Sequence, residues 1–184
     1  VLELSDVRGQ VEGKRALEVA AAGGHNLLLT GEPGAGKSML AERLVGILPP
    51  LDPEESLEVS SVHSVSGLLR SGAPLVSRRP FRAPHHSVTV SGMIGGGSQP
   101  RPGEVSLAHR GALFLDELAE FRSSVLESLR APIESGVVNI IRSGRSVTFP
   151  AGFQLIAAMN PCPCGLRGSE SDGCTCEPFM VRRY

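Results

Sequence analysis

The chain has 184 residues, 41% of them hydrophobic and 20% charged, which is the balance of a globular protein with one sizeable core. No apolar run approaches the roughly 20 residues that cross a bilayer, and the N-terminus lacks the segments of a signal peptide, so we expect a cytoplasmic protein with no membrane partner. The formal net charge of −1 excludes a general attraction to nucleic acid, so any such contact needs a local basic patch.

A helix is predicted over residues 11–22, where apolar side chains recur at helical spacing and two glycines follow. An apolar strand at residues 25–30 then runs into a glycine-rich turn and a helix at residues 39–48. The turn fits G-x-x-x-x-G-K-[ST], in which backbone N–H groups surround the phosphates of a nucleotide and the lysine reaches the terminal ones. The predicted nucleotide-binding residues are Gly31, Glu32, Pro33, Gly34, Ala35, Gly36, Lys37, Ser38 and Met39.

Each residue type in this turn has a physical role. The glycines leave no Cβ between the backbone and the phosphate oxygens, Lys37 supplies a positive charge, and the Ser38 hydroxyl can bind Mg²⁺. The alternative is a glycine turn that only happens to precede a helix. The strand before the turn and the helix after it favour the phosphate site, with ATP and Mg²⁺ as cofactors.

Two segments follow whose structure is harder to predict. Residues 57–62 could form a second short strand, because they lie between a proline and a glycine. Residues 67–103 contain few helix formers and many glycines, prolines and arginines, so they read as an inserted loop or hairpin. Long irregular stretches inside compact domains are usually functional.

A continuous apolar run at residues 111–115 predicts a buried parallel strand and ends in Asp116 and Glu117. Open α/β sheets bind their ligands at the carboxyl ends of their strands. Asp116 is therefore predicted to hold Mg²⁺ through its water shell, and Glu117 to orient and polarise the attacking water. The alternative is a strand that merely stops at two solvated acids.

The chain continues with a predicted helix at residues 120–134, a β-hairpin at residues 137–149 and a buried strand at residues 153–159. That strand ends in Asn160, whose amide is placed to sense the γ-phosphate or to hold the water. The alternative is a turn former before Pro161.

All four cysteines, Cys162, Cys164, Cys174 and Cys176, fall in one short segment as two C-x-C pairs. Four thiolates suit tetrahedral Zn²⁺. The C-x-C spacing is tighter than the usual C-x₂-C, so reduced cysteines in a loop and a redox pair remain alternatives.

Taken together, these motifs resemble the AAA+ ATPases and, within them, the ComM-like branch of the magnesium-chelatase-like group. The match covers nearly the whole chain. The segments that carry it are residues 31–38, 81–86, 102–111, 113–117 and 158–165.

The resemblance implies a P-loop NTPase three-layer αβα sandwich of AAA+ type. Lys37 and Ser38 belong to Walker A, Asp116 and Glu117 to Walker B, and Asn160 to sensor 1. The implied divisions are an AAA+ core at 1–161 with a helix-2 insertion at 67–103 and a pre-sensor hairpin at 137–149, a Cys-rich loop at 162–178, and the start of a continuation at 179–184. The family's arginine finger and sensor 2 cannot be assigned in this chain, which we expect to be a piece of a longer protein.

The resemblance further implies an ATP-driven motor that works as a homo-oligomer, a hexameric ring when full length, and acts on DNA, particularly branched recombination intermediates. The candidate DNA contacts are Arg78, Arg79, Arg82, Arg142 and Arg145. Alternatively, these arginines are solvated or paired with neighbouring acids. Two other functions stay open: a chelatase-type ATPase that remodels a protein partner for metal insertion, and a binding module that holds ATP without hydrolysing it.

Overall fold

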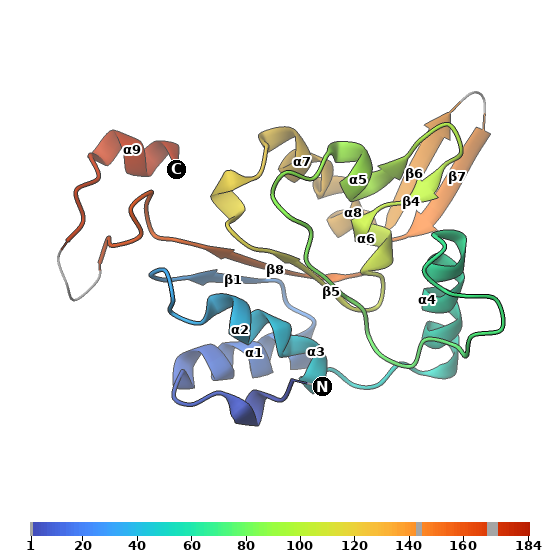
Figure 1. The fold of residues 1–184 in the computed structure, drawn as a ribbon, viewed down its shortest axis with the longest axis horizontal. Helices are drawn as coiled ribbons and strands as arrows, with labels where there is room; N and C mark the ends of the chain where they lie inside the picture. The colour runs from blue at the N-terminus through green and yellow to red at the C-terminus, as the bar shows by residue number, and fades with distance from the viewer. Residues whose placement is uncertain (1, 143–144, 169–172) are drawn as a thin grey trace.

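The computed structural model describes residues 2–142, 145–168 and 173–184 (Figure 1). Its centre is a four-stranded sheet in the order β1-β8-β5-β2, in which every neighbouring pair is parallel. The strands are β1 (Leu27–Thr30), β2 (Phe81–Arg82), β5 (Ala112–Leu115) and β8 (Gln154–Met159). The order is not sequential, so the connections cross over the faces of the sheet and cover them with helices, as parallel sheets require.

The N-terminal helices cover one face of this sheet (Figure 1). They are α1 (Val11–Gly23), α2 (Lys37–Glu42) and α3 (Leu44–Ile47), preceded by the 3-10 turn η1 (Leu4–Asp6). Leu17, Leu40 and Leu44 from these helices are buried in one cluster with Phe114 and Ile156 of the sheet. This cluster fixes the start of α2, and with it the turn that precedes α2.

The opposite face carries the second core cluster, to which β5 contributes Leu113 and Leu115. Successive side chains of a strand point to opposite faces, so one apolar run supplies both clusters. The elements on this side are α5 (Val90–Ile94), α6 (Glu104–Leu107), η2 (Leu118–Glu120), α7 (Ser123–Ser128), α8 (Arg130–Ser135) and the antiparallel hairpin of β6 (Val137–Arg142) and β7 (Arg145–Pro150). The predicted three-layer α/β fold is therefore confirmed.

The strand expected at residues 57–62 is wrong: this segment lies inside α4 (Pro53–Val65). Asp52 and Glu55 form a capping box, in which each side chain accepts the other residue's backbone N–H, and Pro53 occupies the first helical turn. The buried Val59 and Val62 lie three residues apart, so both face the core from one side of the helix.

Two predicted helices are each interrupted once. The helix expected at 39–48 is split at Arg43, and the helix expected at 120–134 begins only at Ser123 and is split at Leu129. At both breaks the backbone N–H bonds to the carbonyl three residues earlier, which tightens the turn.

The segment at 67–103, expected as an insertion, contributes β2 to the central sheet as well as α5. Its last part is a small antiparallel ribbon made by β3 (Gly95–Gly96) with β4 (Arg101–Pro102). At the far end of the chain, α9 (Pro178–Arg183) lies beyond the carboxyl ends of β1 and β8 (Figure 1). Among the described residues, no helix is long and apolar enough to span a membrane.

Candidate nucleotide-binding site

The glycine-rich turn links the carboxyl end of β1 to the start of α2. Gly34 and Gly36 adopt positive φ angles of 81° and 83°, which L-residues with a Cβ rarely tolerate. Leu40 and Ala41, in the second turn of α2, are buried against the sheet and fix the helix on it. The backbone path of the turn thus depends on glycine, and its position depends on the core below.

Lys37 reaches back across the turn. Its ammonium donates to the carbonyl oxygens of Gly31 (2.7 Å) and Glu32 (2.8 Å) and to Oδ1 of Asn160 (3.1 Å). All three acceptors are neutral, so none of them cancels the positive charge. The ammonium is therefore positioned to attract an anion at the ends of β1 and β8.

Ser38 and Asp116 meet on the same side of the sheet. The Ser38 hydroxyl donates to Oδ2 of Asp116 at 2.6 Å, and Oδ1 of Asp116 accepts the backbone N–H of Glu117 at 2.9 Å. Glu117 has a left-handed backbone with φ of 52°, which turns the chain away immediately after β5. A hydroxyl and a carboxylate are hard oxygen donors, so Mg²⁺ fits this pair.

These groups line one cavity of about 360 Å³, within the range of small-ligand sites. Its lining residues are Pro33, Gly34, Gly36, Lys37, Ser38, Met39, Asp116, Glu117 and Asn160. The structure thus brings together the predicted phosphate-binding, magnesium-binding and water-activating residues. The other three predicted nucleotide-binding residues, Gly31, Glu32 and Ala35, line an adjacent cavity of about 540 Å³ with Arg167.

Sequence reasoning missed Gln10, which lies just before α1 with a φ of 50°. Its side-chain amide donates to the carbonyl of Ala35 at 2.8 Å and so ties the N-terminal segment to the phosphate loop. The sequence carries no signal for this contact, because the two residues lie 25 positions apart.

Two of the five candidate DNA-contacting arginines are engaged inside the protein. Arg79 pairs with Glu55 at 2.7 Å and also donates to the carbonyls of Pro49 (2.6 Å) and Arg110 (2.7 Å). Arg82 pairs with Glu104 through two hydrogen bonds of 2.7 and 2.8 Å. These contacts favour the structural alternative for both residues.

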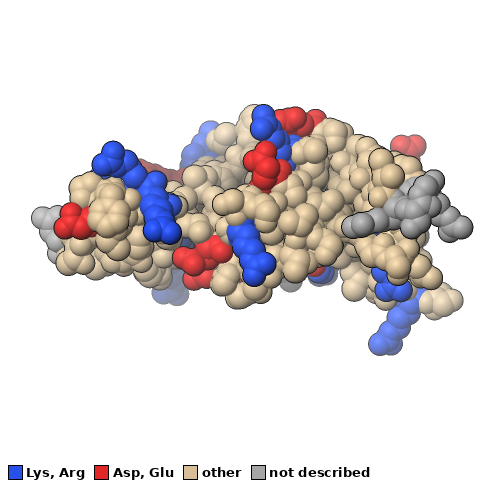
Figure 2. All heavy atoms as spheres, turned by 90° about the horizontal axis from the view of Figure 1, so that it is seen from above, with Lys and Arg blue, Asp and Glu red and all other residues tan. Residues whose placement is uncertain are grey.

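The other three candidates are placed differently. Arg78 is exposed, while Arg142 and Arg145 form the register pair that flanks residues 143–144 of the β6–β7 hairpin, and their side chains lie outside the described part of the chain. On the face that Figure 2 shows, the Lys and Arg side chains of the described residues are interspersed with acidic and neutral ones. A DNA contact on this face would therefore rest on individual basic side chains.

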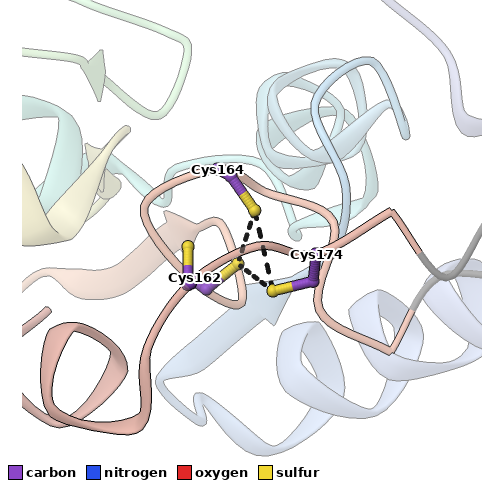
Figure 3. A group of neighbouring side chains, drawn as sticks. Cys162, Cys164 and Cys174 are labelled. Carbon is purple, nitrogen blue, oxygen red and sulfur yellow. Dashed lines mark hydrogen bonds between the residues drawn. The ribbon is translucent and has the colours of Figure 1, made fainter.

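The four cysteines lie in the segment that follows β8. The sulfur of Cys162 lies 3.4 Å from that of Cys164 and 3.7 Å from that of Cys174, and Cys164 and Cys174 are also 3.7 Å apart (Figure 3). With Cys176 included, all four sulfurs lie within 4.8 Å of one another. The thiols are free.

The four thiols differ strongly in acidity. Desolvation opposes ionisation of Cys162, but hydrogen bonds from the Cys164 thiol and the Arg167 backbone N–H lower its pKa to about 6. A backbone hydrogen bond of Cys164 favours ionisation of Cys176, but the neighbouring thiols and desolvation raise its pKa to about 12. Four negative charges this close repel one another, so full ionisation of the group requires a cation.

Comparison with known proteins identifies a family and several relatives that this chain resembles in sequence. Residues 3–184 match the family described as magnesium chelatase, subunit ChlI. YifB of Salmonella typhimurium is 54% identical over 186 residues, which cover 99% of this chain and 35% of YifB. The competence protein ComM of Haemophilus influenzae is 52% identical over 166 residues, which cover 89% of this chain and 32% of ComM.

The fold also matches a solved structure of the complex between subunits BchI and BchD of magnesium chelatase. The TM-score is 0.68 at 24% identity, and the match covers all of this chain and 59% of that one. The chain spans about a third of the length of the curated relatives it matches.

Proposed function

The chain belongs to the magnesium chelatase ChlI family of AAA+ ATPases, and on that premise we propose that it binds ATP with Mg²⁺ and hydrolyses it. One observation carries the proposal: Lys37, Ser38, Asp116 and Glu117 line a single cavity. A phosphate-binding ammonium, a magnesium-binding pair and a carboxylate for the water are all needed at one triphosphate.

The catalytic contribution of this chain is positioning and charge. The backbone N–H groups of the turn and the Lys37 ammonium hold the terminal phosphates, and Ser38 and Asp116 hold the cation. When bound, Mg²⁺ neutralises charge that develops on the phosphoryl oxygens. Glu117 is proposed to orient a water for attack, and Asn160, whose Oδ1 accepts a hydrogen bond from Lys37, is proposed to sense the γ-phosphate.

The client is proposed to be DNA, with the full-length protein assembled as a hexameric ring and acting on branched recombination intermediates. The support is the 52% identity to a competence protein and the position of Arg142 and Arg145, which form the register pair flanking residues 143–144 of the β6–β7 hairpin. Exposed Arg78 is a further candidate contact. Arg79 and Arg82 are removed from the DNA contacts, because each is held by a carboxylate.

A second client is favoured by the likeness to a solved BchI–BchD complex. In this version the ATPase remodels a protein partner for metal insertion, and its ring assembles with that partner. Both versions share the nucleotide site and differ only in what stimulates it. A third version, in which ATP is held without hydrolysis, is tested by the same assay.

The experiment is phosphate release by the full-length protein with forked DNA, duplex DNA and no DNA. Stimulation by forked DNA with affinity that falls steeply as salt rises supports the DNA motor. Basal turnover without any DNA effect, but raised by a protein partner, supports the chelatase-type motor. Absence of turnover with intact nucleotide binding supports a module that holds ATP without hydrolysing it, and contradicts the proposed ATPase.

A further inference from the structure

The sulfur–sulfur distances in the cysteine group match those around one small metal ion. Zn–S bonds of about 2.3 Å in a tetrahedron place the sulfurs about 3.8 Å apart, and three pairs here lie 3.4–3.7 Å apart. A disulfide needs about 2.05 Å. Since all four sulfurs fall within 4.8 Å of one another, a single metal ion can contact them all.

Backbone donors complete this geometry. The N–H groups of Leu166 and Arg167 bond to the sulfurs of Cys164 and Cys162. Such bonds orient metal-binding thiolates and carry part of their charge. Gly165, with a φ of 82°, is the residue that lets the chain turn between them.

The same turn packs on the phosphate loop. A Cβ built on Gly165 would lie 2.6 and 2.7 Å from two ring carbons of Pro33 and 3.9 Å from Cγ of Asn160. Close approach of this kind is possible only for glycine. Arg167 and Gly168 then form one wall of the cavity whose other wall is the phosphate loop itself.

The connection along the chain is equally short. Asn160 bonds to the Lys37 ammonium, and Cys162, which is fully buried, follows two residues later. A metal ion that fixes Cys162 would also fix the path of the chain that leaves Asn160. The metal group and the nucleotide site therefore share both a covalent segment and a packing contact.

We propose that Cys162, Cys164, Cys174 and Cys176 bind one Zn²⁺, and that the zinc-bound turn braces the phosphate loop through Gly165 and Pro33. Zinc holds the turn against Pro33 and so pre-organises the loop for nucleotide. The effect is reciprocal by linkage: nucleotide must slow or weaken the loss of zinc by the same factor that zinc improves nucleotide affinity. This coupling rests on the proposed nucleotide site, whereas the zinc site itself does not.

The first measurement is the zinc content of the full-length protein, purified without chelator. About one zinc per chain is expected in the wild type and much less in a Cys164→Ser/Cys174→Ser variant. The second is the affinity for a fluorescent, non-hydrolysable ATP analogue at fixed Mg²⁺. The cysteine variant is expected to bind it at least about 5-fold more weakly.

Two glycine variants distinguish a disturbed contact between the zinc-bound turn and the phosphate loop from loss of the metal or of the fold. Gly165→Ala keeps every thiol but places a Cβ against Pro33, so zinc stays near one per chain while nucleotide affinity falls. Gly72→Ala carries the same type of backbone strain, at a φ of 76°, but its Cβ meets nothing within 4 Å and the residue lies outside both the cysteine turn and the phosphate loop. It is expected to keep both zinc and nucleotide affinity.

The outcomes are distinct. Zinc content near zero, iron in its place, or oxidised cysteine pairs in the freshly purified protein would overturn the metal site. If the wild type contains about one zinc per chain but binds nucleotide no more tightly than the Gly165→Ala and cysteine variants do, the brace is overturned. If the wild type bound no nucleotide at all, the proposed ATPase would fail, and the zinc content would still decide the metal site.

Discussion

Replacement of Arg79 by glutamine is expected to destabilise the fold. The side chains of Arg79 and Glu55 are only 14% and 16% exposed and lie 2.7 Å apart. Removing one partner of a buried pair costs about 3–5 kcal/mol, because the other charge is left without compensation. Glu55 keeps a longer contact of 3.7 Å with Arg110, which places the loss near the lower end, about 3 kcal/mol.

In a chain of this size each kcal/mol moves the melting temperature by about 2–4 °C, so the expected drop for Arg79→Gln is about 6–12 °C. Differential scanning calorimetry measures it. The matched control is Arg78→Gln, at the exposed residue that precedes Arg79. Its free energy of unfolding is expected to change by no more than about 0.5 kcal/mol. A wild-type melting temperature for Arg79→Gln, combined with a loss of DNA affinity, would refute this reasoning and restore Arg79 as a DNA contact.

Two further predictions concern turnover and pH. Glu117→Gln removes the charge that polarises the water but leaves Lys37 and Ser38 in place, so phosphate release should fall by about 10²-fold or more with nucleotide binding retained; unchanged turnover would favour another base. Burial lowers the pKa of His109 although Glu58 opposes the shift, so the unfolded chain binds more protons and the melting temperature should fall as pH drops below about 6.5. His109→Gln should flatten that part of the profile, and an equally steep profile in the variant would exclude His109 as its cause.

The geometry around His109 explains the direction of its pKa shift. Nδ1 accepts the backbone N–H of Gly152 at 3.0 Å, so the ring proton of the neutral form sits on Nε2 and points at Glu58. Protonation would place a second N–H against that of Gly152. The side chain is 7% exposed, so water cannot easily satisfy the charged ring.

The sequence predicted the parts of the fold that are determined by residues contiguous along the chain. The apolar run of β5 and the glycine turn before Lys37 are contiguous, and their strand, turn and helix context followed directly. The segment at 57–62 was misread because Val59 and Val62 suit a strand as well as a helix. The capping box of Asp52 and Glu55, five residues earlier, was the signal that decides between them.

Contacts between distant residues could not be predicted in the same way. Arg79 finds Glu55 24 positions away, and Arg82 finds Glu104 22 positions away, so their pairing appears only once α4 and α6 are placed. The clustering of the four cysteines in one short segment did predict that they form a single group. The contact of Gly165 with Pro33 depends instead on how two loops meet beyond the sheet, which no local pattern encodes.

The most direct test of the account is the equilibrium binding of ATP to full-length protein carrying Glu117→Gln, with and without Mg²⁺, and again after adding Lys37→Ala. The Lys37 ammonium and the Ser38–Asp116 pair line one cavity, so we predict saturable binding that Mg²⁺ strengthens. Charge-assisted hydrogen bonds to phosphate contribute about 1.5–3 kcal/mol, so Lys37→Ala should weaken binding about 10-fold or more. Binding that ignored both Mg²⁺ and Lys37 would contradict the assignment of this cavity as the nucleotide site.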